Sequence, residues 1–170
     1  MKNSTFWIVA ALVALIIMTT KKSLSYTMLV PEEWRLFGPI IDEMSTKYGV
    51  PLERVAAVIL VESANDHLAV GPVGERGLMQ LTNNALADVN TNYALAFTWG
   101  DMFDIRRNIE AGTAYLALCY RWTGRTSWNS ATQAYNAGAS AFLKDKNAGA
   151  QYLAKVLQSE SEVKLFLSKL

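Results

Sequence analysis

The sequence predicts a mainly α-helical domain, and three observations lead to that fold class. Apolar residues recur at helical spacing in several segments, helix-capping residues stand at the starts of those segments, and no segment keeps the apolar–polar alternation of a strand. The 170 residues, 51% of them hydrophobic, are enough for one domain with its own core. We expect that domain at residues 32–170, after an apolar segment at 1–22 and a linker at 23–31.

The first segment is apolar from Phe6 to Met18 and has lysines on both sides. This length suits the apolar part of a signal peptide, whereas the neighbouring threonines and lysines extend it to a short membrane span. Because the small-residue pattern of a cleavage site is poor, we favour a single uncleaved hydrophobic helix, anchored in the inner membrane through residues 6–20, over a cleaved signal sequence. Both alternatives deliver the following domain to or across a membrane.

Helical patterning begins near Glu32, where acids in the first turn suit the helix dipole. Gly38-Pro39 predicts a break, because proline cannot donate a helical hydrogen bond and its ring crowds the preceding turn. A second piece, Ile40 to Tyr48, is expected to end at Gly49.

The next helix, Leu52 to about Ser63, is apolar on every face from Val55 to Val61 and is therefore predicted to be buried. It ends in a carboxylate, Glu62. Partial burial and the negative end of the helix dipole both disfavour the ionised form, so we expect a raised pKa that suits a general acid. Taken alone, Glu62 also fits a plain helix-end residue.

The rest of the chain continues the helical pattern. Residues 65–76 are expected to form a loop with a turn at Gly71-Pro72, and residues 90–100 an irregular, aromatic-rich stretch. Gly112, inside a helix, indicates the close approach of another backbone. The further helices predicted are 83–89 capped by Thr82, 105–122 capped by Asp104, 128–136 capped by Ser127, 148–157, and 160–170 capped by Ser159.

Composition argues against two classes of site. The net charge is +1, and three lysines lie in the N-terminal segment, so the domain lacks the basic footprint of a nucleic-acid-binding protein. One cysteine, Cys119, and one histidine, His67, form neither a disulfide nor a zinc cluster, and we expect no metal and no cofactor. Cys119 is interpreted as a buried apolar residue and His67 as a solvated or helix-end residue.

Four short motifs carry the indication of function. They are Glu62-Ser63, GLMQL at 77–81, NIEAGTAYL at 108–116 and AYNAG at 134–138. In this order and at these separations they resemble the transglycosylase domain of the soluble lytic transglycosylases, relatives of goose-type lysozyme. YLAKVL at 152–157 matches a tyrosine-containing helix of that family, and the resemblance covers about residues 40–157.

The resemblance implies a lysozyme-like helical fold with a cleft for the glycan strands of peptidoglycan. Glu62 falls on the family's single catalytic glutamate. The implied reaction cleaves the MurNAc–GlcNAc β-1,4 bond and leaves a 1,6-anhydro-MurNAc end, with the substrate's own N-acetyl group replacing a second carboxylate. The substrate-binding residues that the resemblance implies are Ser63, Met79, Gln80, Tyr135 and Asn136, with Tyr135 near the carboxylate.

Two alternatives stay open. A hydrolytic lysozyme of the same fold needs a second carboxylate, and a non-catalytic, membrane-tethered glycan-binding module needs none. The candidates for a second acid are Asp66, Glu75, Asp101 and Asp104.

The chain departs from the family pattern beside the predicted saccharide subsites. Gly71 and Gly74-Glu75 replace a common serine and Gly-Ala pair, and TNNAL replaces Met-Pro after GLMQL. Tyr93, Phe97 and Trp99 fit either packing or stacking on sugars, and Tyr115 fits the core.

The resemblance also implies partners and a location. We expect peptidoglycan and the inner membrane as partners, in a protein that is periplasmic, either exported or anchored. A secretion apparatus or a phage particle is the context that a family member of this size indicates, and the phage virion is then the alternative location.

Overall fold

The computed structural model describes residues 32–169, where the regular structure is helical apart from two isolated β-bridges. The expected hydrophobic helix at 1–22 and linker at 23–31 lie outside the described residues. Within residues 32–169 no helix has the length and apolar character that crossing a membrane requires. The elements are α2 (Glu32–Tyr48), α3 (Leu52–Ser63), α4 (Asn83–Tyr93), the 3-10 helix η1 (Trp99–Phe103), α5 (Ile105–Trp122), α6 (Trp128–Ala137), α7 (Ala139–Lys144) and α8 (Ala150–Leu167).

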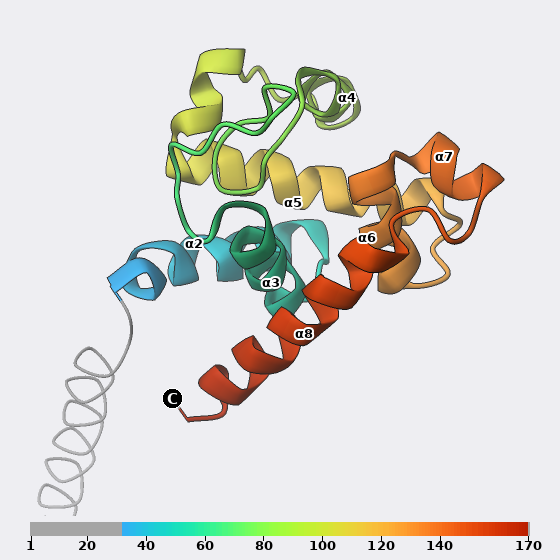
Figure 1. Ribbon diagram of the computed structural model, residues 1–170. Helices are drawn as coiled ribbons and strands as arrows, with labels where there is room; N and C mark the ends of the chain where they lie inside the picture. The colour runs from blue at the N-terminus through green and yellow to red at the C-terminus, as the bar shows by residue number, and fades with distance from the viewer. Residues whose placement is uncertain (1–31, 170) are drawn as a thin grey trace, which may run out of the picture.

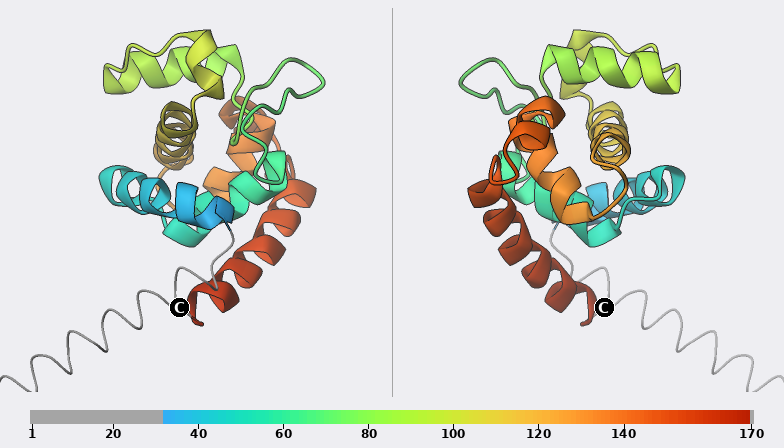
Figure 2. Two further views of the ribbon diagram at one scale, coloured as in Figure 1. Left: turned by 90° about the vertical axis from the view of Figure 1, so that its left-hand side faces the viewer. Right: turned by 90° about the vertical axis from the view of Figure 1, so that its right-hand side faces the viewer.

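Helix α5 lies at the centre of the domain (Figure 1) and contacts α2, α4, η1 and α6. On one side of it, α4 and η1 form an upper layer together with the loop that follows α3. On the other side, α3 packs against α2 and along α8, which also contacts α6. The loop after α3 rises from the lower layer to the upper one (Figure 2), so the end of α3 lies where the layers meet.

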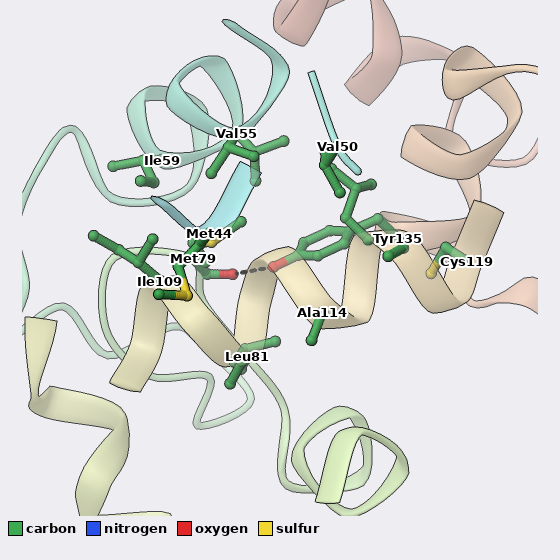
Figure 3. Close-up of a cluster of buried hydrophobic side chains, with 14 of the residues drawn as sticks. Met44, Val50, Val55, Ile59, Met79, Leu81, Ile109, Ala114, Cys119 and Tyr135 are labelled. Atoms are coloured by element: carbon green, nitrogen blue, oxygen red, sulfur yellow. Dashed lines mark hydrogen bonds between the residues drawn. The ribbon is translucent and has the colours of Figure 1, made fainter. Parts of the chain in front are cut away.

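The prediction that α3 is buried is confirmed. Val55, Ala57 and Val58 are all 0% exposed. Side chains from α2, α3, α5, α6 and the loop after α3 converge on one apolar cluster (Figure 3). Cys119 is part of that cluster as predicted, and burial raises the pKa of its thiol to about 12, which keeps it protonated at neutral pH.

Gly112 makes room for a side chain, not for the backbone that we expected from the sequence. A Cβ atom added to Gly112 would lie 2.3 Å from Sδ and 2.7 Å from Cβ of Met79. Met79 is fully buried, and its Cβ is fixed by the backbone of the loop that also carries Gln80. The glycine therefore sets how closely that loop packs onto α5.

We expect Gly112→Ala to lower the free energy of unfolding by about 1–3 kcal/mol, because an extra methyl group in a filled core forces its neighbours to move. Urea denaturation measures the loss. Gly100→Ala is the matched control, since its added Cβ would lie 3.7 Å from its nearest neighbour. An alanine at 112 as well tolerated as one at 100 would contradict the packing role.

Two predicted breaks in helices were wrong. Helix α2 continues through Pro39, because Phe37, Ile41 and Met44 form one buried stripe on both sides of it and the proline ring faces solvent. The burial of this stripe outweighs the hydrogen bond that proline removes.

Helix α8 is also continuous, because Val156 and Val163, seven residues apart, are buried on the same face. Ser159 lies inside this helix and does not cap a new one.

The connecting segments hold more structure than the sequence indicated. Helix α4 runs four residues past its predicted end at Val89, to Tyr93. A 3-10 helix, begun by a capping box between Thr98 and Asp101, starts at the end of the stretch 90–100 that was expected to be irregular. A short helix, α7, was not predicted. The caps at Thr82, Asp104 and Ser127 are confirmed by their side-chain hydrogen bonds to the following backbone N–H groups.

Candidate functional site

Glu62 lies in the last turn of α3, where the chain leaves the core. The helix ends because Ala64 and Asn65 both adopt left-handed backbone conformations, with φ of 50° and 70°. The Glu62 side chain is partly buried, and its Oε1 accepts a 2.7 Å hydrogen bond from the hydroxyl of Tyr152 at the start of α8. This bond fixes one carboxylate oxygen, and the other has no hydrogen-bond partner among residues 32–169, so it is in a position to carry a proton.

The pKa of Glu62 is raised from its ordinary value of 4.5 to about 7. Burial is the main cause, since it penalises the charged form, and the hydrogen bond from Tyr152 works in the opposite direction. The negative charge of Glu75 adds to the rise. At neutral pH a substantial fraction of Glu62 therefore carries a proton that it can donate.

The two neighbours of Glu62 provide a matched pair of variants. We expect Tyr152→Phe to raise the pKa of Glu62, because it removes a donor that stabilises the carboxylate, and Glu75→Gln to lower it, because it removes a like charge. Carbon-13 NMR titration of the Glu62 carboxyl group measures both shifts. Shifts in the same direction would contradict this assignment of causes.

The loop after α3 folds into a tight turn over the site. Its narrowest part runs from Gly71 to Gly74, whose N–H donates to the carbonyl of Gly71, and so confirms the predicted turn. A Cβ atom at Gly71 would lie 2.3 Å from Oε2 of Glu75 and 2.7 Å from Oε1 of Gln80, so both side chains close on the space that this glycine leaves. A larger residue at 71 would displace one of them.

Gln80 is held in one orientation. Its backbone is left-handed, with φ of 45°, and its amide nitrogen donates to the carbonyls of Ala69 and Gly77. Since these bonds use the nitrogen, the amide oxygen is left free of them and lies next to Gly71.

Tyr135 and Met79 join α6 to this loop. The Tyr135 hydroxyl donates a 2.7 Å hydrogen bond to the backbone carbonyl of Met79 (Figure 3), while the Met79 side chain points into the core against Gly112. Both residues therefore support, from the side of the core, the loop that carries Gln80. Burial first, and then the charge of Glu62, raises the pKa of Tyr135 and of Tyr152 well above the ordinary value, so both phenols stay hydrogen-bond donors.

A groove of about 170 Å³ lies between this loop and α6. It is lined by Gln80, Thr82, Tyr115, Tyr135 and Asn136, among others, and Asn136 is exposed. Ser63 lies beside Glu62 and donates its hydroxyl back to the carbonyl of Ile59. The six residues singled out from the sequence thus lie on the end of α3, the loop after it and the end of α6.

Only one of the four candidate second acids is shown to act on Glu62. Asp101 closes a capping box and pairs with Arg107, and Asp104 caps α5. Asp66 is exposed and accepts a hydrogen bond from its own loop. Glu75 is the acid whose charge reaches Glu62.

Two residues that contribute to the geometry were missed by the sequence reasoning. The sequence places Tyr152 only in a helix that matches the family, and its spacing gives no sign of a hydrogen bond to Glu62. Asn108, inside the NIEAGTAYL motif, accepts from the N–H of Met79 and donates to the carbonyls of Arg76 and Met102. A buried asparagine within an apolar helix face was the available signal for its role.

The family model for the transglycosylase SLT domain matches residues 39–158 of this chain. The chain belongs to the transglycosylase SLT domain family. The resemblance that the motifs indicated is therefore confirmed, and the matched range holds every element from the middle of α2 to the first half of α8.

Named relatives of this SLT domain are larger proteins. Over 107 residues it is 36% identical to the membrane-bound lytic murein transglycosylase F of Desulfosudis oleivorans, a match that covers 60% of this chain and 22% of the relative. The membrane-bound lytic murein transglycosylase C of Photorhabdus laumondii is 32% identical over 134 residues, which cover 69% and 37%. The chain thus spans well under half the length of these relatives.

Solved structures confirm the lysozyme-like fold of the SLT domain. The 70 kDa soluble lytic transglycosylase of Escherichia coli superposes with a TM-score of 0.69 at 20% identity, covering 77% of this chain and 24% of that one. An inactive variant of the lytic transglycosylase Slt of Pseudomonas aeruginosa gives 0.69 at 21% identity, covering 86% and 27%.

Proposed function

We propose that this protein is a peptidoglycan lytic transglycosylase that cleaves the MurNAc–GlcNAc β-1,4 bond and forms 1,6-anhydro-MurNAc. The observation that carries the proposal is the environment of Glu62, a largely buried carboxyl group with a pKa of about 7 that accepts a hydrogen bond from Tyr152. Breaking a glycosidic bond requires a proton donor at the leaving oxygen, and an acid that titrates near neutral pH meets that requirement. Membership of the family and the names of the relatives support the same reaction.

The proposed reaction uses Glu62 twice. Glu62 first gives its proton to the bridging oxygen, so that the bond from C1 of MurNAc to that oxygen breaks and the GlcNAc hydroxyl leaves. The N-acetyl carbonyl of the same MurNAc stabilises the positive charge at C1. Ionised Glu62 then takes the proton of the C6 hydroxyl, whose oxygen bonds to C1 and closes the anhydro ring without water.

The other site residues then have distinct proposed roles. Gln80 presents its amide oxygen to the substrate, while Asn136 and Ser63 line the approach from α6 and α3. Met79 and Tyr135 hold the loop that carries Gln80 in place through their hydrogen bond. Tyr152 orients Glu62 and limits how far its pKa rises.

A hydrolytic muramidase is the second candidate, and the observation that favours it is the effect of the Glu75 charge on the pKa of Glu62. The charge of Glu75 acts on Glu62, and in many glycosidases a second carboxylate of this kind activates water. Mass spectrometry of the muropeptides released from purified sacculi separates the two reactions. We expect anhydro ends, lighter than reducing ends by one water, and reducing ends alone would overturn the proposal in favour of hydrolysis.

A binding module without activity is the third candidate. Sacculi that retain the protein and release no muropeptide would support it, provided that the protein is folded by circular dichroism. Glu62→Gln assayed in parallel shows whether any release depends on this carboxyl group.

We further propose that the domain at 32–170 acts in the periplasm. Residues 1–22 would deliver it there as an anchor or a signal sequence, and residues 23–31 would link this segment to the domain. The word membrane-bound in the names of the relatives supports this location. A secretion apparatus or phage particle as partner remains a proposal, and deletion of the gene, scored for assembly against lysis, tests it.

A further inference from the structure

A second groove adjoins the candidate site and is not used by the proposed reaction. It has a volume of about 350 Å³ and is lined by Val70, Val73, Arg76, Thr82, Trp99 and Phe103, among others. Thr82 lines this groove and also the groove beside Tyr135, so the two grooves are neighbours. We call it the Arg76 groove.

The guanidinium of Arg76 is held firmly in this groove. Its central carbon lies 4.7 Å from the ring centroid of Trp99 and 4.9 Å from that of Phe103, and Nη1 donates to the Trp99 carbonyl at 3.0 Å. The Arg76 backbone is fixed as well, because its N–H donates to Leu81 and its carbonyl accepts from Leu81 and Asn108. The guanidinium charge is therefore fixed in position, and the Arg76 side chain loses little further conformational entropy when a ligand binds.

This charge has no acidic partner among residues 32–169. Arg54, Arg106 and Arg107 each form an ion pair with a carboxylate, whereas Arg76 does not. Its single hydrogen bond uses one of five N–H donors, so further donors remain for a ligand. A planar guanidinium that is stacked on aromatic rings and lacks a counter-ion is suited to bind a carboxylate through two parallel hydrogen bonds.

Exposed apolar side chains stand beside the charge. Val70 is 63% exposed and Val73 is 82% exposed, on the same loop that carries Glu75 and Gln80. Apolar side chains this exposed gain from covering by a ligand, and here they flank a cation. The groove therefore fits a ligand that has both a carboxylate and apolar groups.

We propose that the Arg76 groove binds a carboxylate carried by the lactyl substituent of a muramyl residue while the glycan lies in the adjoining cleft. This rests on the proposed function, since it takes peptidoglycan as the ligand. The lactyl group of each MurNAc ends either in a free carboxylate or in a stem peptide with carboxylates of its own. Both sources share the chemistry that Arg76 recognises, and the groove thereby distinguishes muramyl glycans from uncharged ones.

The test measures binding in Glu62→Gln protein, where cleavage does not interfere. Isothermal titration calorimetry compares Arg76→Gln and Arg76→Lys with the parent and with Arg35→Gln, an exposed arginine on α2, as the matched control. Three ligands are used: glycan strands that keep stem peptides, strands stripped by an amidase so that the lactyl carboxylate is free, and a chito-oligosaccharide without carboxylates. The melting temperature of each variant shows that it is folded.

We expect Arg76→Gln to weaken binding of a carboxylate-bearing strand by about tenfold or more, which is the effect of losing charge-assisted hydrogen bonds, and to leave chito-oligosaccharide binding within about twofold. Arg76→Lys should fall between, because it keeps the charge and loses the planar pair of donors. A loss confined to strands with stem peptides assigns the stem carboxylates, and a loss confined to stripped strands assigns the lactyl carboxylate.

Equal losses for all three ligands would overturn the proposal, since Arg76 would then only hold the loop in shape. Unchanged affinities would overturn it as well. Both results are independent of the proposed reaction, because a protein that forms no anhydro product still reports on carboxylate binding in this assay.

Discussion

We expect Glu62→Gln to abolish muropeptide release and yet to make the protein more stable than the parent above neutral pH. Glutamine has no proton to give to the bridging oxygen and cannot recover one from the C6 hydroxyl. General acid catalysis is worth roughly 10²–10⁴ in rate, and because the same group acts in both steps we expect a loss of at least about a thousandfold. Chromatography of the products released from sacculi measures it.

The gain in stability follows from the raised pKa of Glu62, from 4.5 to about 7. Between these two values the folded state binds a proton that the unfolded state has released, so stability falls as the pH rises through this window. Below about pH 4 both states are protonated and the contribution is fully present. Glutamine stays neutral throughout, so the variant should gain on the parent by about 3 kcal/mol by pH 8.

A matched control separates this effect from a general change of charge. Glu53 lies in the first turn of the same helix, and Glu53→Gln should keep both the activity and the pH dependence of stability. Urea denaturation at pH 4 and pH 8 provides the comparison. Turnover by Glu62→Gln at more than about a thousandth of the parent's rate, or a variant less stable than the parent at pH 8, would contradict the role of this carboxyl group.

Several features that depend on local sequence were predicted correctly. The buried helix α3 followed from apolar residues on every face, and the caps at Thr82, Asp104 and Ser127 followed from side chains that bond to the next turn. These signals need only a few neighbouring residues. The same holds for the carboxylate at the end of α3, whose raised pKa was expected from its position.

The features that depend on distant contacts were missed. Tyr152 reaches Glu62 across 90 residues, and nothing in the spacing of YLAKVL indicates that bond. The breaks expected at Pro39 and Ser159 are overridden by burial against other helices, which a local pattern does not contain. Gly112 indicates close packing, but the sequence does not identify Met79 as the residue that fills the space.

The burial of Arg54 was also not predictable from the sequence, because an arginine normally indicates an exposed position. Arg54, near the start of α3, is 5% exposed, and its Nε donates a 2.6 Å hydrogen bond to Glu160 of α8. Its other nitrogens donate to Thr132, to Asn129 and to the carbonyl of Trp128. These residues form the Arg54 cluster, which ties α3 to α6 and α8, the helices that carry Tyr135 and Tyr152.

We expect Arg54→Ala to lower the free energy of unfolding by about 3–5 kcal/mol. The substitution leaves the carboxylate of Glu160 buried with Lys164 alone as its ion-pair partner, and an uncompensated buried charge is costly. Arg106→Ala is the matched control, because its ion pair with Glu43 is half exposed on both sides and should contribute little to stability. Urea denaturation compares the two losses, and equal losses would show that the Arg54 cluster is not a special source of stability.

The pH dependence of this loss has a defined sign. Burial alone would raise the pKa of Glu160, but its hydrogen bonds with Lys164 and Arg54 outweigh burial and lower it. A lowered pKa adds stability above the ordinary value of 4.5 and loses it as the pH falls through the lower folded-state value. The difference between the parent and Arg54→Ala should therefore shrink in acid.

The double variant Arg54→Met with Glu160→Met separates stability from positioning. Removing both charges restores much of the stability, since an apolar pair of similar size avoids the cost of desolvating ions. If the cluster also sets the distance between α3 and α8, the hydrogen bond from Tyr152 to Glu62 should weaken in this stable protein, and the pKa of Glu62 should rise further by NMR titration. A double variant that is stable and keeps the parent's pKa at Glu62 would show that the Arg54 cluster holds the fold together without tuning the acid.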